Sequence, residues 1–228
     1  MDSNFHILAI ETSGTVCDVA VLHGPAHDPG LLAEIRVNLR HAHSEKLLDV
    51  IEDVLFLARV PKEMLSGLAV SIGPGSFTGL RIGLSAAKGM VFGLDIPLVG
   101  VPTLDALAFR FHQPGRKTIV AIGARKGECY LARYENGALS EPYRVIPSSE
   151  LGQQMQPGCL VITDRRDDLV NAMPGQLGDQ LEIFGGDLAV PDAVVIGRMG
   201  LERLARGEHD HAESLVPLYV QAFKGVMG

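Results

Sequence analysis

The fold of this chain is decided by the stretch Ser71-Ile72-Gly73-Pro74-Gly75-Ser76-Phe77-Thr78-Gly79-Leu80-Arg81-Ile82-Gly83. A short apolar run leads into a Gly-Pro-Gly turn. Neither a strand nor a helix continues easily there, because proline lacks an N–H and glycine adopts angles that other residues avoid. Small and large apolar residues then recur at helical spacing up to Gly93. The stretch therefore predicts a strand, a tight loop and a long helix.

One face of the predicted helix, Ser76–Gly93, carries mostly small residues. The residues that share this face are Gly79, Gly83, Ala86, Met90 and Gly93. Glycine costs a soluble helix about 1 kcal/mol relative to alanine, which close approach of another backbone can offset. Two interpretations stay open: the helix packs on the chain's own sheet, or it contacts a partner. Phosphate binding at the helix N-terminus is disfavoured, because the G-x-x-x-x-G-K-[ST] spacing is absent.

The composition indicates an ordinary globular chain. Its 228 residues are 46% hydrophobic, enough for one large or two small domains. No apolar run approaches the roughly 20 residues that cross a bilayer, and the N-terminus shows no signal-peptide pattern, so we expect a cytoplasmic protein without membrane contact. The formal charge of -7 and the 5% aromatic content disfavour tight RNA binding by this chain alone. Three scattered cysteines suggest neither disulfides nor zinc.

The first half of the chain alternates between strand and helix patterns. Three consecutive strands with short connections open it and should pair antiparallel. The strand candidates are Phe5–Glu11, a second run from Val16 to Gly24, Leu31–Val37, Leu68–Ile72 and Leu98–Val101. The helix candidates are Glu45–Arg59, the opening helix and Leu104–Phe111. This order predicts an α/β layer with a mixed sheet.

The second half begins the same pattern again. Its strand candidates are Thr118–Ala124, Glu128–Tyr134, Leu160–Thr163 and Leu181–Phe184. A last helix, Asp192–Arg206, is expected to be capped near Asp192 and to stop at Gly207. We place an N-terminal domain at residues 1–102 and a smaller C-terminal domain at 103–228, with an apolar tail, about 215–228, that packs back on the first.

Chemistry-bearing residues are few. Glu11, Thr12 and Ser13 form a turn that offers hydroxyls and N–H groups to a phosphate, although a plain polar hairpin turn is the stronger interpretation. His41 and His43 are two residues apart and would diverge on a helix, so no metal site is predicted. No catalytic group is assigned.

Several motifs together resemble the bacterial TsaB (YeaZ) family. They are the opening stretch continued through Pro102-Thr103-Leu104-Asp105-Ala106-Leu107, Ile10-Glu11-Thr12-Ser13, Arg40-His41-Ala42-His43-Ser44-Glu45-Lys46-Leu47-Leu48, and Ala124-Arg125-Lys126-Gly127-Glu128-Cys129-Tyr130. The resemblance implies an actin-like (ASKHA, ribonuclease H-like) fold of two α/β halves, each a mixed sheet flanked by helices. It also implies a role in making N6-threonylcarbamoyladenosine (t6A) in tRNA. By the same resemblance, the transferase chemistry is expected to belong to a paralogous partner, TsaD, which in that family carries an H-x-x-x-H metal motif.

The resemblance further implies that this chain is the non-catalytic member. His43 stands where the metal motif begins, but Leu47 stands where it should end. The chain is expected to bind and activate TsaD, with the ATPase TsaE as third component, tRNA reached only through the complex, and ATP or ADP with Mg²⁺ at that level. Two departures from the family pattern are Gly123, where the family usually has Asp, and Gln221, where the tail usually has Arg.

We expect the partner, TsaD or a second copy of this chain, to contact the helices Ser44–Arg59 and Ser76–Gly93. The interface residues predicted on them are Leu47, Ile51, Leu55, Gly79, Leu80, Gly83, Leu84, Ala86, Ala87 and Met90. A different class of function remains as the alternative: an independent actin-fold small-molecule kinase or ATPase that binds nucleotide near Glu11.

Overall fold

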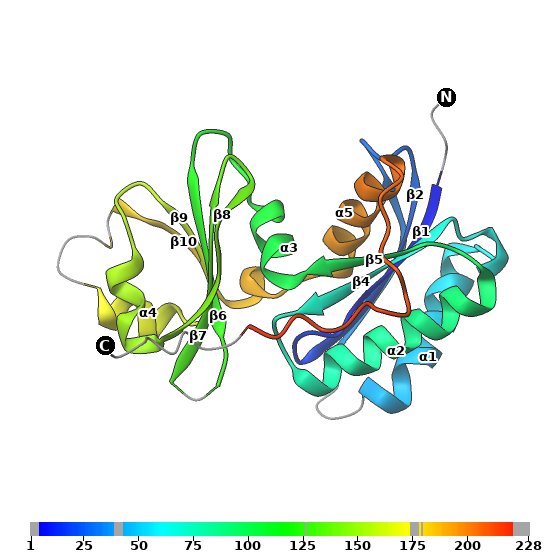
Figure 1. Ribbon diagram of the computed structural model, residues 1–228, viewed down its shortest axis with the longest axis horizontal. Helices are drawn as coiled ribbons and strands as arrows, with labels where there is room; N and C mark the ends of the chain where they lie inside the picture. The colour runs from blue at the N-terminus through cyan, green and yellow to red at the C-terminus, as the bar shows by residue number, and fades with distance from the viewer. Residues whose placement is uncertain (1–4, 39–42, 126, 174–177, 179, 221–228) are drawn as a thin grey trace. The chain divides into compact units, whose positions relative to one another are not determined.

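The computed structural model describes residues 5–38, 43–125, 127–173, 178 and 180–220, which fall into two compact units (Figure 1). Unit 1 contains Met1–Ala106 and Pro191–Leu218. Unit 2 contains Leu107–Val190 and Tyr219–Gly228. The helix α3 (Thr103–Arg110) spans the first boundary between them.

Unit 1 is built on a five-stranded sheet in the order β3-β2-β1-β4-β5. Strands β1, β2 and β3 pair antiparallel, which confirms the pairing predicted for the first three strands, while β4 runs parallel to both β1 and β5. Its elements are β1 (Phe5–Glu11), β2 (Val16–Gly24), β3 (Gly30–Asn38), α1 (His43–Ala58), the short 3₁₀ helix η1 (Lys62–Met64), β4 (Gly67–Gly73), α2 (Phe77–Leu94), β5 (Leu98–Pro102) and α5 (Ala193–Ala205).

Helices cover both faces of this sheet. Side chains alternate along β1, so Leu8 and Ile10 join the core beneath α1 and α2, while Ile7 and Ala9 join the core beneath α5 (Figure 1). All four of these side chains are completely buried. Because alternate residues of the central strand β1 are apolar on both faces, each face of the sheet needs a covering layer of helices.

Unit 2 repeats the same topology with its own five strands, in the order β10-β9-β6-β7-β8. The strands β6, β7 and β8 pair antiparallel, and β9 runs parallel to β6 and β10. Its elements are β6 (Lys117–Gly123), β7 (Glu128–Glu135), β8 (Ala138–Pro147), the 3₁₀ helix η2 (Ser148–Gln154), β9 (Leu160–Thr163), α4 (Arg166–Ala172), β10 (Glu182–Phe184) and the 3₁₀ helix η4 (Gly186–Ala189). The two related halves confirm the predicted fold class.

The two units divide the chain differently from the boundary expected at residue 102. Residues 191–218 return to unit 1, because α5 packs its buried face on β1, β2 and β4. The expected helix ends are present: the Asp192 side chain accepts a hydrogen bond from Val195 N–H, and Gly207 has a φ of 74°. Of the tail expected at about 215–228, residues up to Leu218 fall in unit 1 and Tyr219–Gly228 in unit 2, and residues 221–228 lie outside the described residues.

Candidate functional site

The loop before α2 packs on the turn between β1 and β2. Ser76 caps the helix by accepting a hydrogen bond from Gly79 N–H at 3.2 Å, and its own N–H donates to the Ser13 carbonyl at 2.6 Å. Gly73 has a φ of 99°, which favours glycine. The Gly-Pro-Gly turn therefore directs α2 across the end of β1.

The small residues in the first half of α2 face the chain's own Thr12. A Cβ atom at Gly79 would overlap the Thr12 carbonyl oxygen, and one at Gly83 would overlap Thr12 Oγ1. That hydroxyl donates to the Gly79 carbonyl at 2.8 Å. Close packing on the sheet thus explains these two glycines. A bulky residue at Gly83 would disturb the folded monomer first, so it is no probe of a partner interface.

The other residues predicted for the interface also pack inward. Leu47, Ile51, Leu84 and Ala87 are at most 5% exposed and lie in the core beneath α1 and α2, and Leu80, 2% exposed, packs beside Gly73. Leu55, Ala86 and Met90 are partly buried against that same core. These residues hold the two helices on the sheet, and none of them belongs to the exposed class.

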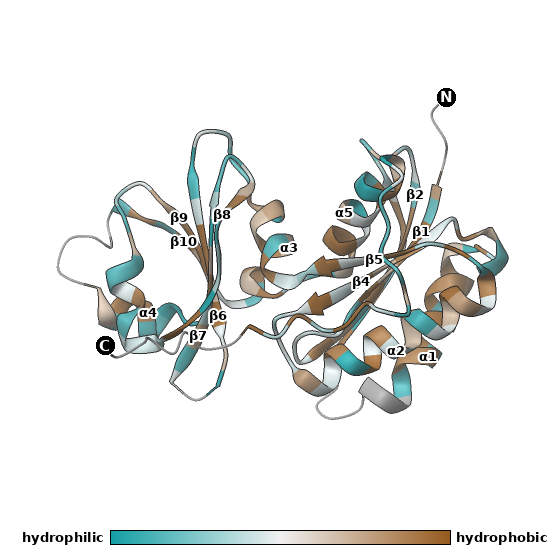
Figure 2. Ribbon diagram, viewed as in Figure 1, coloured by the Kyte–Doolittle hydropathy of each residue, from teal (hydrophilic) through white to brown (hydrophobic). Residues whose placement is uncertain are grey.

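Solvent-exposed positions on α1 and α2 carry a different apolar set. It comprises Leu48, Phe56 and Leu57 on α1 and Phe92 on α2, all at least 60% exposed. Gly89 and Gly93 lie on the same helix as Phe92, and a Cβ atom added to either meets nothing within 4 Å. Figure 2 shows how rich in hydrophobic residues both helices are. The sequence analysis did not single out this set. It predicted that the dominant apolar stripe of each helix contacts the partner, whereas that stripe packs in the core.

Glu11, Thr12 and Ser13 are buried, at 2%, 0% and 5% exposure. The Ser13 N–H donates to Glu11 Oε1 at 2.5 Å, while Glu11 Oε2 has no hydrogen-bond partner among the described residues. Burial raises the pKa of the Glu11 carboxyl, against hydrogen bonds from Ser13 and Ser71 that lower it. A Cβ atom at Gly75 would overlap the Ser13 carbonyl oxygen. The turn is closed by the loop before α2 and does not fit a phosphate.

Asp18 is a second buried carboxylate beside this turn, and sequence reasoning missed it. It is the cross-strand partner of Glu11 and is completely buried. Its Oδ2 accepts a hydrogen bond from Ala193 N–H, at the start of α5, at 3.1 Å. Burial raises the pKa of Asp18 to about 7. The only signal in the sequence is an acidic residue inside an apolar strand.

In unit 2, strand β6 holds the central place that β1 holds in unit 1, and the end of β6 is covered by different residues. Gly123 ends β6, and a Cβ atom there would overlap the guanidinium of Arg165, which follows β9. The Gly123 N–H donates to Asp164 Oδ1 at 2.8 Å. The glycine at this position therefore makes room for the guanidinium of Arg165. A carboxylate that would bind magnesium or a nucleotide is absent from this position.

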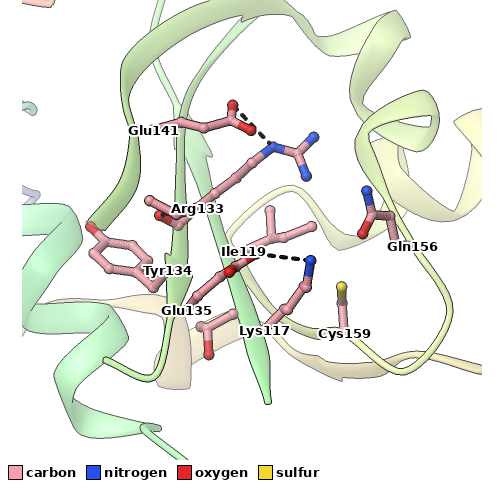
Figure 3. Close-up of a pocket in the computed structure, with 10 residues that line it drawn as sticks. Lys117, Ile119, Arg133, Tyr134, Glu135, Glu141, Gln156 and Cys159 are labelled. Atoms are coloured by element: carbon pink, nitrogen blue, oxygen red, sulfur yellow. Dashed lines mark hydrogen bonds and ion pairs between the residues drawn. The ribbon is translucent and has the colours of Figure 1, made fainter. Parts of the chain in front are cut away.

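Unit 2 also has a small surface pocket of about 60 Å³, shown in Figure 3. Its charges are matched within the chain: Lys117 Nζ lies 2.8 Å from Glu135 Oε1, and Arg133 Nε lies 3.6 Å from Glu141 Oε2. Arg133 also donates to the Gln154 backbone carbonyl at 3.0 Å. The charged side chains that line this pocket therefore form ion pairs with one another, and the pocket is too small for a nucleoside.

The described residues bring no three His, Cys, Asp or Glu side chains together in a way that would hold a metal ion. His43 begins α1, and Leu47, four residues later, is a core residue at 1% exposure. His41 lies outside the described residues. Within the described part of the chain, no helix combines the length and apolar character needed to cross a membrane.

These features define an α/β protein of two actin-like units, with a packed first-strand end in each and an exposed apolar surface on α1 and α2. A family model described as "TsaD: tRNA N6-adenosine threonylcarbamoyltransferase" matches residues 31–141. The Escherichia coli "tRNA threonylcarbamoyladenosine biosynthesis protein TsaB" is 36% identical over 136 residues, which are 58% of this chain and 57% of that protein. An uncharacterised Mycobacterium bovis protein is 33% identical over 153 residues, 67% of this chain and 68% of that one.

Solved structures agree. YeaZ from Pseudomonas aeruginosa covers 95% of this chain and 100% of its own, at a TM-score of 0.78 and 26% identity. An activator of 2-hydroxyisocaproyl-CoA dehydratase from Clostridium difficile shares the fold at a TM-score of 0.51 and 11% identity, covering 91% of this chain and 99% of its own. The chain belongs to the TsaB (YeaZ) family. It spans a little over half the length of the first curated TsaB relatives it matches.

Proposed function

We propose that this chain is a non-catalytic scaffold subunit of the tRNA N6-adenosine threonylcarbamoyltransferase complex, and that it binds and activates TsaD. TsaE is the third component, and tRNA is reached through the complex. The TsaB names of the curated relatives and the TsaD description of the matching family model support this proposal. The modified nucleoside is t6A at position 37 of tRNAs that read codons beginning with A.

The observation that carries the proposal is the exposed apolar set on α1 and α2. Phe56 is 81% exposed and Phe92 is 63% exposed, so both contribute little to the monomer's own core. Exposed apolar side chains on two neighbouring helices are typical of a protein-binding region, where aromatic residues supply much of the binding energy. The open positions at Gly89 and Gly93 let a partner helix approach the α2 backbone closely.

A scaffold role also agrees with the chemistry-bearing residues. The position four residues after His43 is held by the core residue Leu47, so an H-x-x-x-H motif would need a ligand inside the core. The carboxylates Glu11 and Asp18 are buried beneath protein atoms. Neither arrangement offers the exposed general base or metal ligands that phosphoryl transfer requires.

The test is reconstitution of tRNA modification from TsaD, TsaE and this chain. Wild-type protein should stimulate t6A formation, whereas Phe56→Asp should reduce stimulation and co-elution with TsaD at least about tenfold, because a charge would be desolvated at the interface. The matched control is Val170→Asp, which alters an apolar residue on α4 that is 51% exposed. It should behave as wild type.

Three outcomes would contradict the proposal. Full activity from TsaD and TsaE alone would remove the scaffold role. Equal effects of Phe56→Asp and Val170→Asp would remove the interface assignment. Association of this chain only with itself, together with turnover of ATP by this chain alone, would favour an independent kinase or ATPase.

A further inference from the structure

The segment 207–218, here called the strap, follows α5 and crosses unit 1 without forming a helix or a strand (Figure 1). It begins at Gly207 and ends where Leu218 N–H donates to the Ile72 carbonyl at 2.7 Å, beside the loop that leads into α2. None of its twelve residues belongs to the buried class. The strap is therefore held by a few specific contacts, with only partial burial of its side chains.

The first of these contacts is a clasp on the edge strand β5. The Asp210 N–H donates to the Leu98 carbonyl at 2.8 Å, and Asp210 Oδ2 accepts from Gly100 N–H at 2.8 Å. Arg203, on α5, donates to the Gly100 carbonyl at 2.9 Å and to both Asp210 carboxylate oxygens at 3.1 and 3.3 Å. Two charged side chains thus satisfy both backbone groups of Gly100, as a neighbouring strand would.

The second contact is an apolar seat between β5 and α2. Ala212 and Leu215 pack against the same core as Met90 and Leu94 in the C-terminal half of α2. A Cβ atom at Gly100 would lie 3.0 Å from Leu215 Cδ1, so the glycine admits the leucine side chain to the sheet edge. Lys88 Nζ also reaches the Glu213 carbonyl at 3.4 Å.

We propose that the strap is a detachable brace that fixes the C-terminal half of α2 and thereby sets the affinity of the α2 surface for its partner. With the clasp closed, Leu215 packs against the core on which Met90 and Leu94 of α2 also rest. When the clasp opens, this packing is lost while the first half of α2 stays fixed on Thr12. The effect on affinity rests on the proposed function, whereas the effect on α2 does not.

The clasp can be opened by one substitution, Asp210→Ala, in the full chain. Amide hydrogen exchange of Gly100, Leu218 and residues 89–94 should become about tenfold faster or more, as expected for the loss of charge-assisted hydrogen bonds. Exchange of residues 80–84 should not change. Affinity for TsaD, measured by calorimetry, should fall about fivefold or more, the range typical of a coupling between sites.

Glu213→Ala is the matched control, a cleaner one than Glu208→Ala, since Glu208 also contacts Arg203 of the clasp at 3.9 Å. The Glu213→Ala variant removes an exposed carboxylate from the strap, keeps the backbone carbonyl that Lys88 reaches, and should leave both readings unchanged. Leu215→Ala is the second variant, since it keeps the clasp and removes the seat; it should speed exchange of residues 89–94 without affecting Asp210.

The brace is overturned if the strap amides exchange faster in Asp210→Ala while residues 89–94 keep their wild-type rates. The regulatory role is overturned if α2 loosens and the affinity for TsaD stays the same. Absence of any binding by wild-type protein would instead contradict the proposed function, and the exchange rates would still decide whether the strap braces α2.

Discussion

Asp18 is a buried carboxylate that is only partly satisfied by hydrogen bonds. Its carboxylate is completely buried, one oxygen accepts the Ala193 N–H, and the other has no hydrogen-bond partner among the described residues. Arg36 Nη1 lies 3.7 Å from Oδ2, the oxygen that accepts the Ala193 N–H, too far for a hydrogen bond. Because burial disfavours the charged form, the pKa of Asp18 rises from 3.8 to about 7. The folded chain therefore holds this proton more tightly than the unfolded chain does.

Asp18→Asn should therefore stabilise the protein at pH 8. As pH rises from about 4 to about 7, the unfolded chain loses this proton first, so the aspartate lowers wild-type stability across that window. Asparagine keeps an oxygen for Ala193 N–H without the charge. We expect Tm to rise by about 2 to 4 °C or more at pH 8 and little at pH 4, by calorimetry. An unchanged Tm difference between the two pH values, or an equal gain in the exposed control Asp49→Asn, would refute this.

At the scale of the element, α2 uses glycine for two different purposes. Gly79 and Gly83 bring the helix backbone onto Thr12, whereas Gly89 and Gly93 face open space. The same residue type thus serves the core in the first half and an exposed surface in the second. Helical periodicity groups Gly79, Gly83 and Gly93 on one stripe, because it cannot tell which neighbour each turn of the helix meets.

Alanine substitutions should separate the two purposes. Gly79→Ala should destabilise the protein by about 1 to 3 kcal/mol, because the methyl group would overlap the Thr12 carbonyl oxygen. Gly89→Ala should stabilise it by up to about 1 kcal/mol, because only helix propensity changes. Urea unfolding measures both changes. Effects of the same sign would contradict the assignment of the two halves of α2.

At the scale of the whole molecule, the sequence predicts the topology of unit 1 better than its surfaces. Turn residues and alternating strands such as Phe5–Glu11 dictate the order of elements, because these signals are local. Strand β8 (Ala138–Pro147) was missed, since it is an edge strand with a single buried residue, Ile146, and an internal Pro142. The pairing of Asp18 with Ala193, 175 residues apart, has no local signal at all. The exposed aromatic residues became distinguishable only once the core was known.

The return of α5 to unit 1 gives the last prediction. Ala193, Ile196 and Leu201 are completely buried against the sheet, and burial of each large aliphatic side chain contributes about 1.5 to 3 kcal/mol. Domain stability is only about 5 to 15 kcal/mol, so a chain that ends at Val190 should leave unit 1 without a cooperative fold. Hydrogen exchange at Leu8 and Ile10 should lose its protection. A chain that ends at Val220 keeps α5 and should retain protection. If protection at Leu8 and Ile10 survives removal of α5, residues 5–106 fold without it, and α5 is an addition to unit 1 and not part of its core.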